Sequence, residues 1–164
     1  MRKLLALCAL VLLLQACSKP DMETTYKRNE NKVTVTSGVW GTVSFREGNC
    51  MPGSGSRTCK EYPVRRVVRF YAPTLVSQAT NAHPILDGFF SSFSTALVKE
   101  IETDNDGFYQ AELAPGTYTM VVLEDQDLYA RLTNNTPSGM MINPFTLGSE
   151  KVNRNFVIDY KAAY

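Results

Sequence analysis

The sequence has a single histidine, a single tryptophan, no strong excess of one charge and no hydrophobic run long enough to cross a bilayer. Its 17 Lys and Arg residues nearly balance 16 Asp and Glu residues, which gives a formal net charge of +1. Because nucleic-acid binding needs a basic stripe or patch, we expect no nucleic-acid partner. The length suits one domain of ordinary size.

Motifs of catalytic sites are also missing. No G-x-S-x-G elbow accompanies the serines, and the GSGS stretch follows no βα unit that would make it a phosphate loop. His83 stands in the loop-like stretch NAHP, which favours a surface histidine over a base or ligand. Glu124, Asp125 and Asp127 follow a predicted strand, and we interpret them as a solvated loop edge rather than an acid–base pair. The sequence therefore predicts no catalytic residue, no metal site and no cofactor.

The N-terminus resembles the signal of a bacterial lipoprotein. The chain opens with MRK and an apolar run over residues 4–14, which is shorter than the roughly 20 residues of a membrane-spanning helix. The stretch LQAC that follows resembles a lipobox, whose cysteine becomes the lipidated first residue of the mature protein. An ordinary signal peptide cleaved near Ala16 is the alternative. We expect residues 1–16 to be removed and Cys17 to carry the lipid.

Residues 17–31 are polar, as expected of a flexible tether between a lipid and a folded domain. Membrane attachment would then come from the lipid rather than from a basic patch. We therefore expect a lipid-anchored protein of the bacterial cell envelope, at the outer membrane, with the membrane itself as one partner.

Cysteine usage indicates one disulfide. Cys8 would leave with the signal and Cys17 would carry lipid, so only Cys50 and Cys59 remain. In an oxidising compartment two cysteines this close in sequence are typical of a disulfide, and their spacer MPGSGSRT is rich in turn residues. Two cysteines alone make a poor zinc site. We predict a bond between Cys50 and Cys59.

Residues 32–164 have the pattern of a single β-sandwich domain. Short stretches alternate apolar and polar residues between Gly, Pro, Asn and Asp, as in KVTVTSGVWGTVSFR. In this stretch one face would hold Val39, Gly41, Val43 and Phe45, and the other Trp40, Thr42 and Ser44. In the stretch PVRRVVRFYAP the arginines are expected on a solvated outer face. Further strands are expected over residues 96–103, 107–113, 117–124, 140–147 and 153–160, with a long crossover over residues 74–95.

The stretch TDNDGFYQAELAPGTYTMVV, residues 103–122, admits two interpretations. Asp104 and Asp106 suit the start of a calcium loop, but such a loop needs helical flanks and a bidentate Glu at its twelfth position, where this chain has Pro115. The alternative is a β-hairpin turn over residues 104–107, in which Asn, Asp and Gly tolerate positive φ. We expect the hairpin and no calcium.

A second turn, LAPGTY, follows at residues 113–118. Pro115 fixes φ, Gly116 provides the bend, and Tyr118 is placed to hydrogen-bond back across the corner that begins at Leu113. A G-x-V strand, then T-D-x-x-G-x-Y, then L-x-P-G-x-Y resembles the carboxypeptidase regulatory-like, or prealbumin-like, β-sandwich family over roughly residues 38–125. The resemblance implies an all-β, Greek-key β-sandwich of about seven or eight strands.

Enzymes that share such a sandwich use residues that this chain lacks. Transthyretin-related hydroxyisourate hydrolases need more than one histidine and a C-terminal Tyr-Arg-Gly-Ser, whereas this chain has only His83 and ends in YKAAY. Ring-cleaving dioxygenases need two histidines and two tyrosines for iron. The sequence therefore favours a noncatalytic binding or assembly module for a protein or glycan partner. The alternatives are a pilus or adhesin subunit that associates by strand exchange and a small envelope hydrolase.

Overall fold

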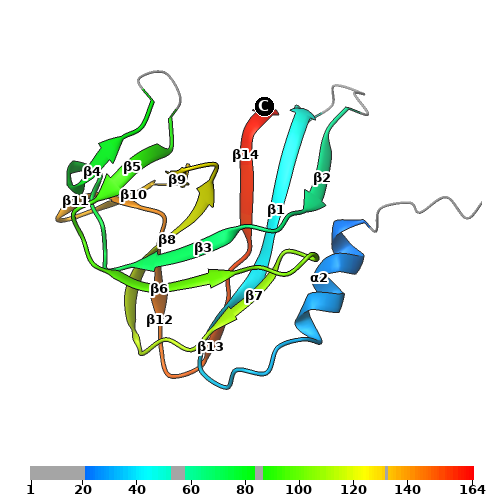
Figure 1. The fold of residues 1–164 in the computed structure, drawn as a ribbon, viewed down its shortest axis with the longest axis horizontal. Coiled ribbons are helices and arrows are strands. Elements are labelled where there is room, and N and C mark those ends of the chain that lie inside the picture. Colours follow the sequence, from blue (N-terminus) through cyan, green and yellow to red (C-terminus); the bar gives the residue numbers. More distant parts are fainter. Residues whose placement is uncertain (1–20, 53–57, 84–86, 132) are drawn as a thin grey trace, which may run out of the picture.

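The structure is a computed structural model that describes residues 21–52, 58–83, 87–131 and 133–164. Within these ranges two β-sheets pack together over an apolar core, beside a two-stranded ribbon and one short α-helix, α2 (Met22–Glu30) (Figure 1). The prediction of an all-β, sandwich-like fold is confirmed. The predicted signal peptide over residues 1–16 and the lipidated Cys17 lie outside the described residues.

Within the described ranges, no helix has the length and apolar character needed to cross a membrane.

The first sheet is built around β1 (Gly38–Asn49), which is long enough to hold two neighbours on each side. β7 (Phe108–Ala111) and β2 (Lys60–Pro63) pair with it in antiparallel fashion, one after the other. On the opposite edge β13 (Lys151–Asn153) and β14 (Phe156–Ala163) run parallel to it. Among the described strands these two pairings are parallel and the others are antiparallel.

The second sheet is built around β8 (Gly116–Glu124). The strand order is β4 (Ala79–Asn81), β5 (Phe89–Phe93), β9 (Asp127–Tyr129), β8, β3 (Val67–Tyr71) and β6 (Leu97–Glu102). β12 (Pro144–Leu147) pairs with the first half of β8. The short 3-10 helix η1 (Val76–Gln78) precedes β4, and β10 (Thr133–Thr136) and β11 (Gly139–Ile142) form the separate ribbon.

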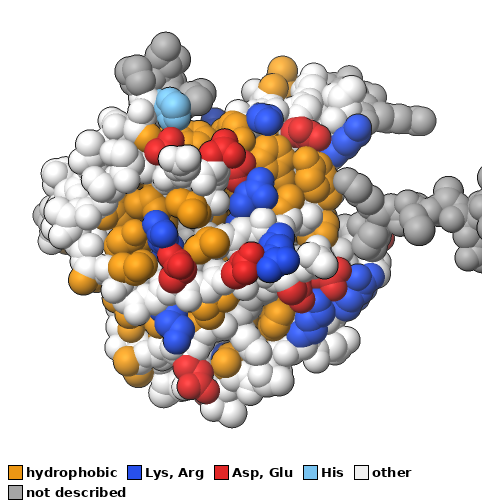
Figure 2. Space-filling view, viewed as in Figure 1, with side chains coloured by type: hydrophobic (Ala, Val, Ile, Leu, Met, Phe, Trp, Pro, Cys, Tyr) orange, Lys and Arg blue, Asp and Glu red, His pale blue; other side chains and the backbone are white. Residues whose placement is uncertain are grey.

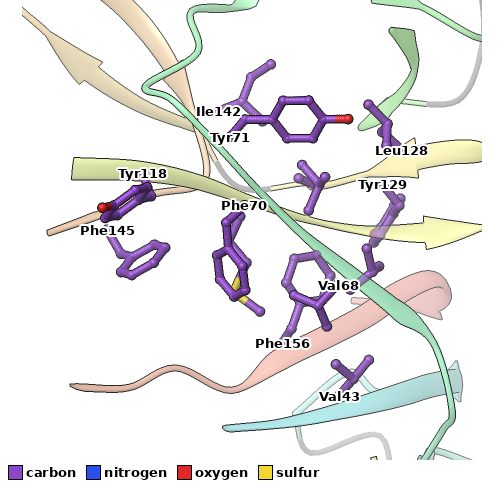
Figure 3. Close-up of a cluster of buried hydrophobic side chains, with 14 of the residues drawn as sticks. Val43, Val68, Phe70, Tyr71, Tyr118, Leu128, Tyr129, Ile142, Phe145 and Phe156 are labelled. Carbon is purple, nitrogen blue, oxygen red and sulfur yellow. The ribbon is translucent and has the colours of Figure 1, made fainter. Parts of the chain in front are cut away.

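The core lies between the two sheets. The inward side chains of β1 are buried as the alternation predicted, and Figure 3 shows Val43 and Phe156 of the first sheet opposite Val68 and Phe70 of the second. Tyr109 of β7 lies in the same layer and is almost completely buried. Burial of each such side chain contributes about 1.5–3 kcal/mol, so this layer is the main source of stability.

The turn over residues 104–107 connects the two sheets and is not a β-hairpin, because β6 pairs with β3 whereas β7 pairs with β1. The Asp104 carboxylate accepts hydrogen bonds from the backbone N–H groups two and four residues further on, at 2.8 and 3.0 Å. Gly107 has φ 69°, and a Cβ added there would lie 2.2 Å from the carbonyl oxygen of Val43. The expected turn is present, but the expectation that its two flanking strands pair with each other is wrong. The turn instead passes close to β1 at Val43, whose backbone N–H donates to the Gly107 carbonyl at 2.8 Å, and the chain crosses there from the second sheet to the first.

Several expected strands are divided or newly found, so the described residues hold β1–β14 in place of the seven or eight strands expected. The crossover expected over residues 74–95 contains η1 and the antiparallel pair β4 and β5. The strand expected over residues 140–147 is two strands, separated by Asn143 with φ 33°. Strands of three or four residues are too short to show an alternation, which is why the sequence did not reveal them.

Helix α2 lies within the segment expected to be a flexible tether. Asp21 caps it, because the Asp21 carboxylate accepts a hydrogen bond from the backbone N–H of Thr24 at 3.0 Å. Asn29, at the other end, is fully buried, and its amide donates to the Thr42 hydroxyl (2.8 Å) and to the Asp106 carbonyl (3.0 Å). The helix therefore docks on the outer face of β1 through a polar layer. It has no apolar stripe, so hydrophobic periodicity could not predict it.

Candidate functional site

Cys50 and Cys59 form the predicted disulfide, with their sulfur atoms 2.04 Å apart. Cys50 directly follows β1 and Cys59 directly precedes β2, so the bond ties together two neighbouring strands of the first sheet. The disulfide prediction is confirmed, and its position indicates a structural role.

The corner over residues 113–118 carries the chain from β7 in the first sheet to β8 in the second. The Tyr118 side chain is only 8% exposed, and its hydroxyl donates to the carbonyl oxygen of Ala114 at 2.7 Å. A Cβ added at Gly116 would lie 3.5 Å from the Tyr118 hydroxyl, which is ordinary contact. Leu113 packs against the core before Pro115 begins the bend. The tyrosine therefore has the backbone partner that the sequence led us to expect.

Glu124 is not part of a solvated loop edge, which corrects the interpretation made from the sequence. Its carboxylate is 6% exposed and accepts hydrogen bonds from Arg66 Nε (2.6 Å), Arg66 Nη2 (3.2 Å) and the Tyr160 hydroxyl (3.0 Å). Burial and the bond to Glu124 raise the pKa of Tyr160 to about 12. The carboxylate faces inward because it is paired with a guanidinium that neutralises it, a condition that local sequence does not reveal.

The two aspartates near Glu124 lie in a different setting. Asp125 has φ 55° in the turn between β8 and β9, and Asp127 Oδ2 is 3.3 Å from His83 Nε2. The side chain of His83 is 46% exposed, so it is a surface histidine as predicted. These groups do not converge on a common point with Glu124.

The aspartates of the 104–107 turn are held by cations of the chain itself. Lys32 Nζ lies 2.7 Å from carboxylate oxygens of both Asp104 and Asp106, and Arg28 Nη1 is 3.0 Å from Asp106. The hydrogen bond from Lys32 lowers the pKa of Asp106 below its usual value. Among the residues that the structure describes, no group of three or more His, Cys, Asp or Glu side chains is arranged to hold a metal ion.

The arginines of the β3 region are paired on the outer face of the second sheet. Arg65 lies 2.8 Å from Glu102 and Arg69 lies 2.6 Å from Glu100. Figure 2 shows positive and negative side chains side by side over β3 and β6. These pairs are solvent-accessible, which agrees with the interpretation of a wetted sheet face rather than a binding patch.

A chain of aromatic rings reaches the surface at the far ends of β1, β2 and β14. Phe45 lies 5.9 Å from Tyr62 and 5.5 Å from Tyr160, and Tyr160 lies 5.1 Å from Phe89, between ring centroids. Figure 2 shows hydrophobic side chains gathered over this end of the first sheet. Phe45 and Phe89 are buried, so only the tyrosines offer contact area to a partner.

A groove of about 370 Å³, which we call the tryptophan groove, lies between α2 and the outer face of the first sheet. It is lined by Glu23, Tyr26, Lys27, Glu30, Trp40, Thr42, Asn153 and Asn155. The alternation of β1 sends Trp40 and Thr42 to this face, and docking of α2 supplies the opposite wall.

The tryptophan groove combines an aromatic side chain with hydrogen-bonding groups that have no partner among the described residues. The Trp40 ring is half-buried, and no described residue accepts a hydrogen bond from its indole N–H. Asn155 Oδ1 accepts from the Thr42 backbone N–H at 2.9 Å, which orients the amide and leaves Nδ2 unpaired in the described part of the chain. Glu30 is exposed near them. An aromatic face with amide and carboxylate groups suits a ligand that is apolar on one face and polar at its rim, such as a sugar ring.

A second, smaller depression of about 220 Å³ adjoins the groove, because Asn155 lines both. We call it the arginine hollow, and its lining is Arg131, Asn143, Arg154, Asn155, Phe156, Val157 and Asp159. Neither Arg131 nor Arg154 was predicted from the sequence as a site residue. They are far apart in the chain and belong to no motif, so local sequence held no signal for them.

Comparisons with protein family models, with characterised proteins and with solved structures found no match to this chain. The observations define a protein of mostly β-strands, whose antiparallel sheets pack together and which contains a Cys50–Cys59 disulfide. They assign it to no family.

Proposed function

We propose that this protein is a noncatalytic binding module of the bacterial cell envelope, and that its tryptophan groove binds a glycan. The observation that carries the proposal is the placement of Trp40, the single tryptophan, in a groove beside the Asn155 amide and the Glu30 carboxylate. A partly exposed aromatic face beside hydrogen-bonding groups can contact a ring that is apolar on its face and polar at its rim.

The finer fold assignment belongs to the same proposal. We infer a prealbumin-like Greek-key sandwich related to the carboxypeptidase regulatory-like domains. Support comes from the order of the three motifs and from the Tyr118 hydroxyl, which bonds across the corner to Ala114. In such domains the sandwich is a scaffold, and binding groups lie on its faces and loops.

A noncatalytic role is supported by the hydrogen bonds of Glu124, the carboxylate considered as a possible catalytic acid. Glu124 is held by both Arg66 and Tyr160, so its carboxylate is committed to joining β3, β8 and β14. Asp127 and His83 form one exposed pair. A hydrolytic enzyme would need such groups to converge on a pocket with room for substrate.

Fluorescence of the single tryptophan gives a direct test. We would titrate the full-length protein with soluble peptidoglycan fragments and chito-oligosaccharides and follow the emission of Trp40, which alone reports on the groove. We expect a saturable change in emission. Co-sedimentation with purified peptidoglycan sacculi should fall by about tenfold or more in Trp40→Ala, which corresponds to about 1.4 kcal/mol.

The matched control is Leu97→Ala, because Leu97 of β6 is an exposed apolar residue that lines neither the groove nor the arginine hollow. Its sedimentation with sacculi should equal that of the wild type. Wild-type binding that survives Trp40→Ala unchanged, or an emission that no envelope glycan alters, would refute the proposal.

Envelope anchoring through Cys17 is proposed on the LQAC motif alone and is tested separately. Cells labelled with palmitate should incorporate label into the wild-type protein, while Cys17→Ser should remain an unprocessed and unlabelled precursor. Label retained by Cys17→Ser would show that the anchor lies elsewhere.

A second candidate function, a pilus or adhesin subunit, is favoured by one observation. Among the described strands β14 pairs only with β1, so its other edge is available for an added strand. Strand exchange would give concentration-dependent oligomers of the full-length protein in light scattering. A monomer at every concentration would remove this candidate and leave the glycan proposal standing.

A further inference from the structure

We propose that the arginine hollow is a binding site for a carboxylate group carried by a larger ligand. The inference rests on Arg154, Arg131 and their surroundings, and it does not depend on what occupies the tryptophan groove.

Arg154 is fixed in place by the second sheet. Its Nη2 donates to the side-chain oxygen of Asn143 at 3.1 Å. Asn143 is 5% exposed, and its own amide donates to the Met120 carbonyl at 2.7 Å. Asn143 stands between β11 and β12 and has a positive φ of 33°. This backbone conformation orients the amide toward Arg154. Such backbone conformations cost energy and persist only where the surroundings fix them.

The backbone of Arg154 is also fixed. Its carbonyl oxygen accepts a hydrogen bond from the buried hydroxyl of Tyr109. A Cβ on Gly41 would lie 2.1 Å from the same oxygen, so a glycine in β1 is what allows this approach. Both ends of the Arg154 side chain are therefore held before any ligand arrives, which reduces the entropy lost on binding.

Only one nitrogen of the Arg154 guanidinium donates hydrogen bonds to described residues. Both hydrogen bonds that it makes, to Asn143 and to the Pro144 carbonyl at 3.4 Å, come from Nη2. In the described part of the chain, Nε and Nη1 have no acceptor within hydrogen-bond distance. Either fork of a guanidinium includes Nη2, so Nε and Nη1 cannot share one carboxylate as a pair, but each can donate one charge-assisted hydrogen bond to a carboxylate oxygen.

The charge of the hollow favours a single negative charge. Arg131 lines it and is 49% exposed, with Nη1 3.6 Å from the carboxylate of Asp159. Asp159 also accepts hydrogen bonds from the hydroxyls of Tyr129 (2.8 Å) and Tyr164 (2.9 Å), so it is satisfied within the protein. Two arginines and one aspartate leave one positive charge, which a carboxylate balances better than a doubly charged phosphate.

The size of the hollow indicates that it would bind the end group of a ligand rather than a whole ligand. Its volume of about 220 Å³ lies below the roughly 300–1,000 Å³ typical of complete small-molecule sites. Asn155 adds a neutral donor on the side that faces the tryptophan groove. A ligand with a terminal carboxylate, such as a uronic acid, has the required charge and the required polar rim.

The test uses the full-length protein and compares d-glucuronate with d-glucose, which differ at one carboxylate. Titration followed by two-dimensional NMR detects millimolar affinities. We expect saturable shifts with glucuronate, centred on residues of the hollow, and none there with glucose. Arg131→Gln and Arg154→Gln should each weaken glucuronate binding by about tenfold or more. Arg154→Lys should weaken it as well, because an ammonium keeps the charge but loses the planar group that Asn143 and the Pro144 carbonyl hold in place.

The matched control is Arg69→Gln, which removes an arginine that is paired with Glu100 on the outer face of the second sheet. It should bind glucuronate as the wild type does, and so should Trp40→Ala. Equal binding of glucose, stronger binding of inorganic phosphate, or unchanged glucuronate affinity in Arg131→Gln would overturn the proposal. Loss of glucuronate binding in Trp40→Ala would move the carboxylate to the groove and would also overturn it. Because Arg131 is exposed, its variant remains informative if Arg154→Gln does not fold.

Discussion

Tyr118 contributes to stability in two separable ways, through its ring and through its hydroxyl. The ring packs 5.7 Å from Phe145 between centroids, and the hydroxyl donates to the Ala114 carbonyl at 2.7 Å. Tyr118→Phe should lower the free energy of unfolding by about 1 kcal/mol, the typical net value of one hydrogen bond. Tyr118→Ala should lower it by about 3–5 kcal/mol, because it also removes the buried ring.

Urea unfolding of both variants measures these costs. The ordering is the decisive point, since a merely superficial tyrosine would make both substitutions nearly neutral. A Tyr118→Ala variant within about 0.5 kcal/mol of the wild type would show that the corner does not hold the two sheets together.

Gly107 gives a second prediction at the scale of one residue. Its φ of 69° disfavours a side chain, and a Cβ would meet the Val43 carbonyl oxygen at 2.2 Å. Gly107→Ala should therefore destabilise the protein by at least about 1–2 kcal/mol, the usual cost of a left-handed conformation, plus the cost of moving β1. Gly148 is the matched control, because no atom lies within 4 Å of the Cβ position there.

Thermal unfolding compares the two glycine variants under the same conditions. We expect a clear fall in Tm for Gly107→Ala and almost none for Gly148→Ala. Equal Tm values would mean that the turn can move away from β1 without strain.

At the scale of elements, α2 shows how a helix can dock without an apolar face. Asn29→Ala leaves the Thr42 hydroxyl and the Asp106 carbonyl without their donor in a buried layer. Asn29 Oδ1 is itself buried without a partner in the described residues, so its removal offsets part of the loss. We expect a net cost of about 1–2 kcal/mol in chemical unfolding.

Lys27→Ala is the matched control for α2. Lys27 lies on the same helix and pairs with Glu23 at 2.7 Å in an exposed position. Removing such a pair should cost less than about 0.5 kcal/mol. If Asn29→Ala were as mild as Lys27→Ala, the polar layer under α2 would not hold the helix on β1.

Some elements could be predicted from local sequence patterns and others could not. The alternation of β1 predicted its inward face, including Val43, and placed Trp40 on the other face, but Thr42 and Ser44 of that other face are buried, which the alternation did not predict. The turn over residues 104–107 was predicted by its Asn, Asp and Gly content. The sequence did not reveal that the two strands joined by this turn lie in different sheets. A turn has the same local chemistry whether it joins neighbours in one sheet or crosses to another.

At the scale of the whole molecule, buried phenols predict a loss of stability at high pH. Burial raises the pKa of Tyr129 and Tyr160 above the usual 10, for Tyr160 to about 12. In the unfolded chain the phenols lose their protons near pH 10. Above that pH the unfolded state therefore binds fewer protons than the folded state, and the free energy of unfolding falls as the pH rises from about 10 to about 12.

Urea unfolding between about pH 8 and pH 11 measures this dependence. Tyr160→Phe removes one of the groups and should make the decline shallower. A free energy of unfolding that is the same at both ends of this range would contradict the burial of these hydroxyls.

The class of fold, the disulfide and the placement of the corner could all be predicted from the residues alone. Each of these depends on neighbours in the chain, since alternation, turn chemistry and cysteine spacing act over a few residues. Three features are visible only in the folded chain: α2 docks on the first sheet, Glu124 is buried against Arg66, and Arg131 and Arg154 line one hollow. These contacts join residues far apart in sequence through polar groups, and polar pairing leaves no periodic pattern from which it can be predicted.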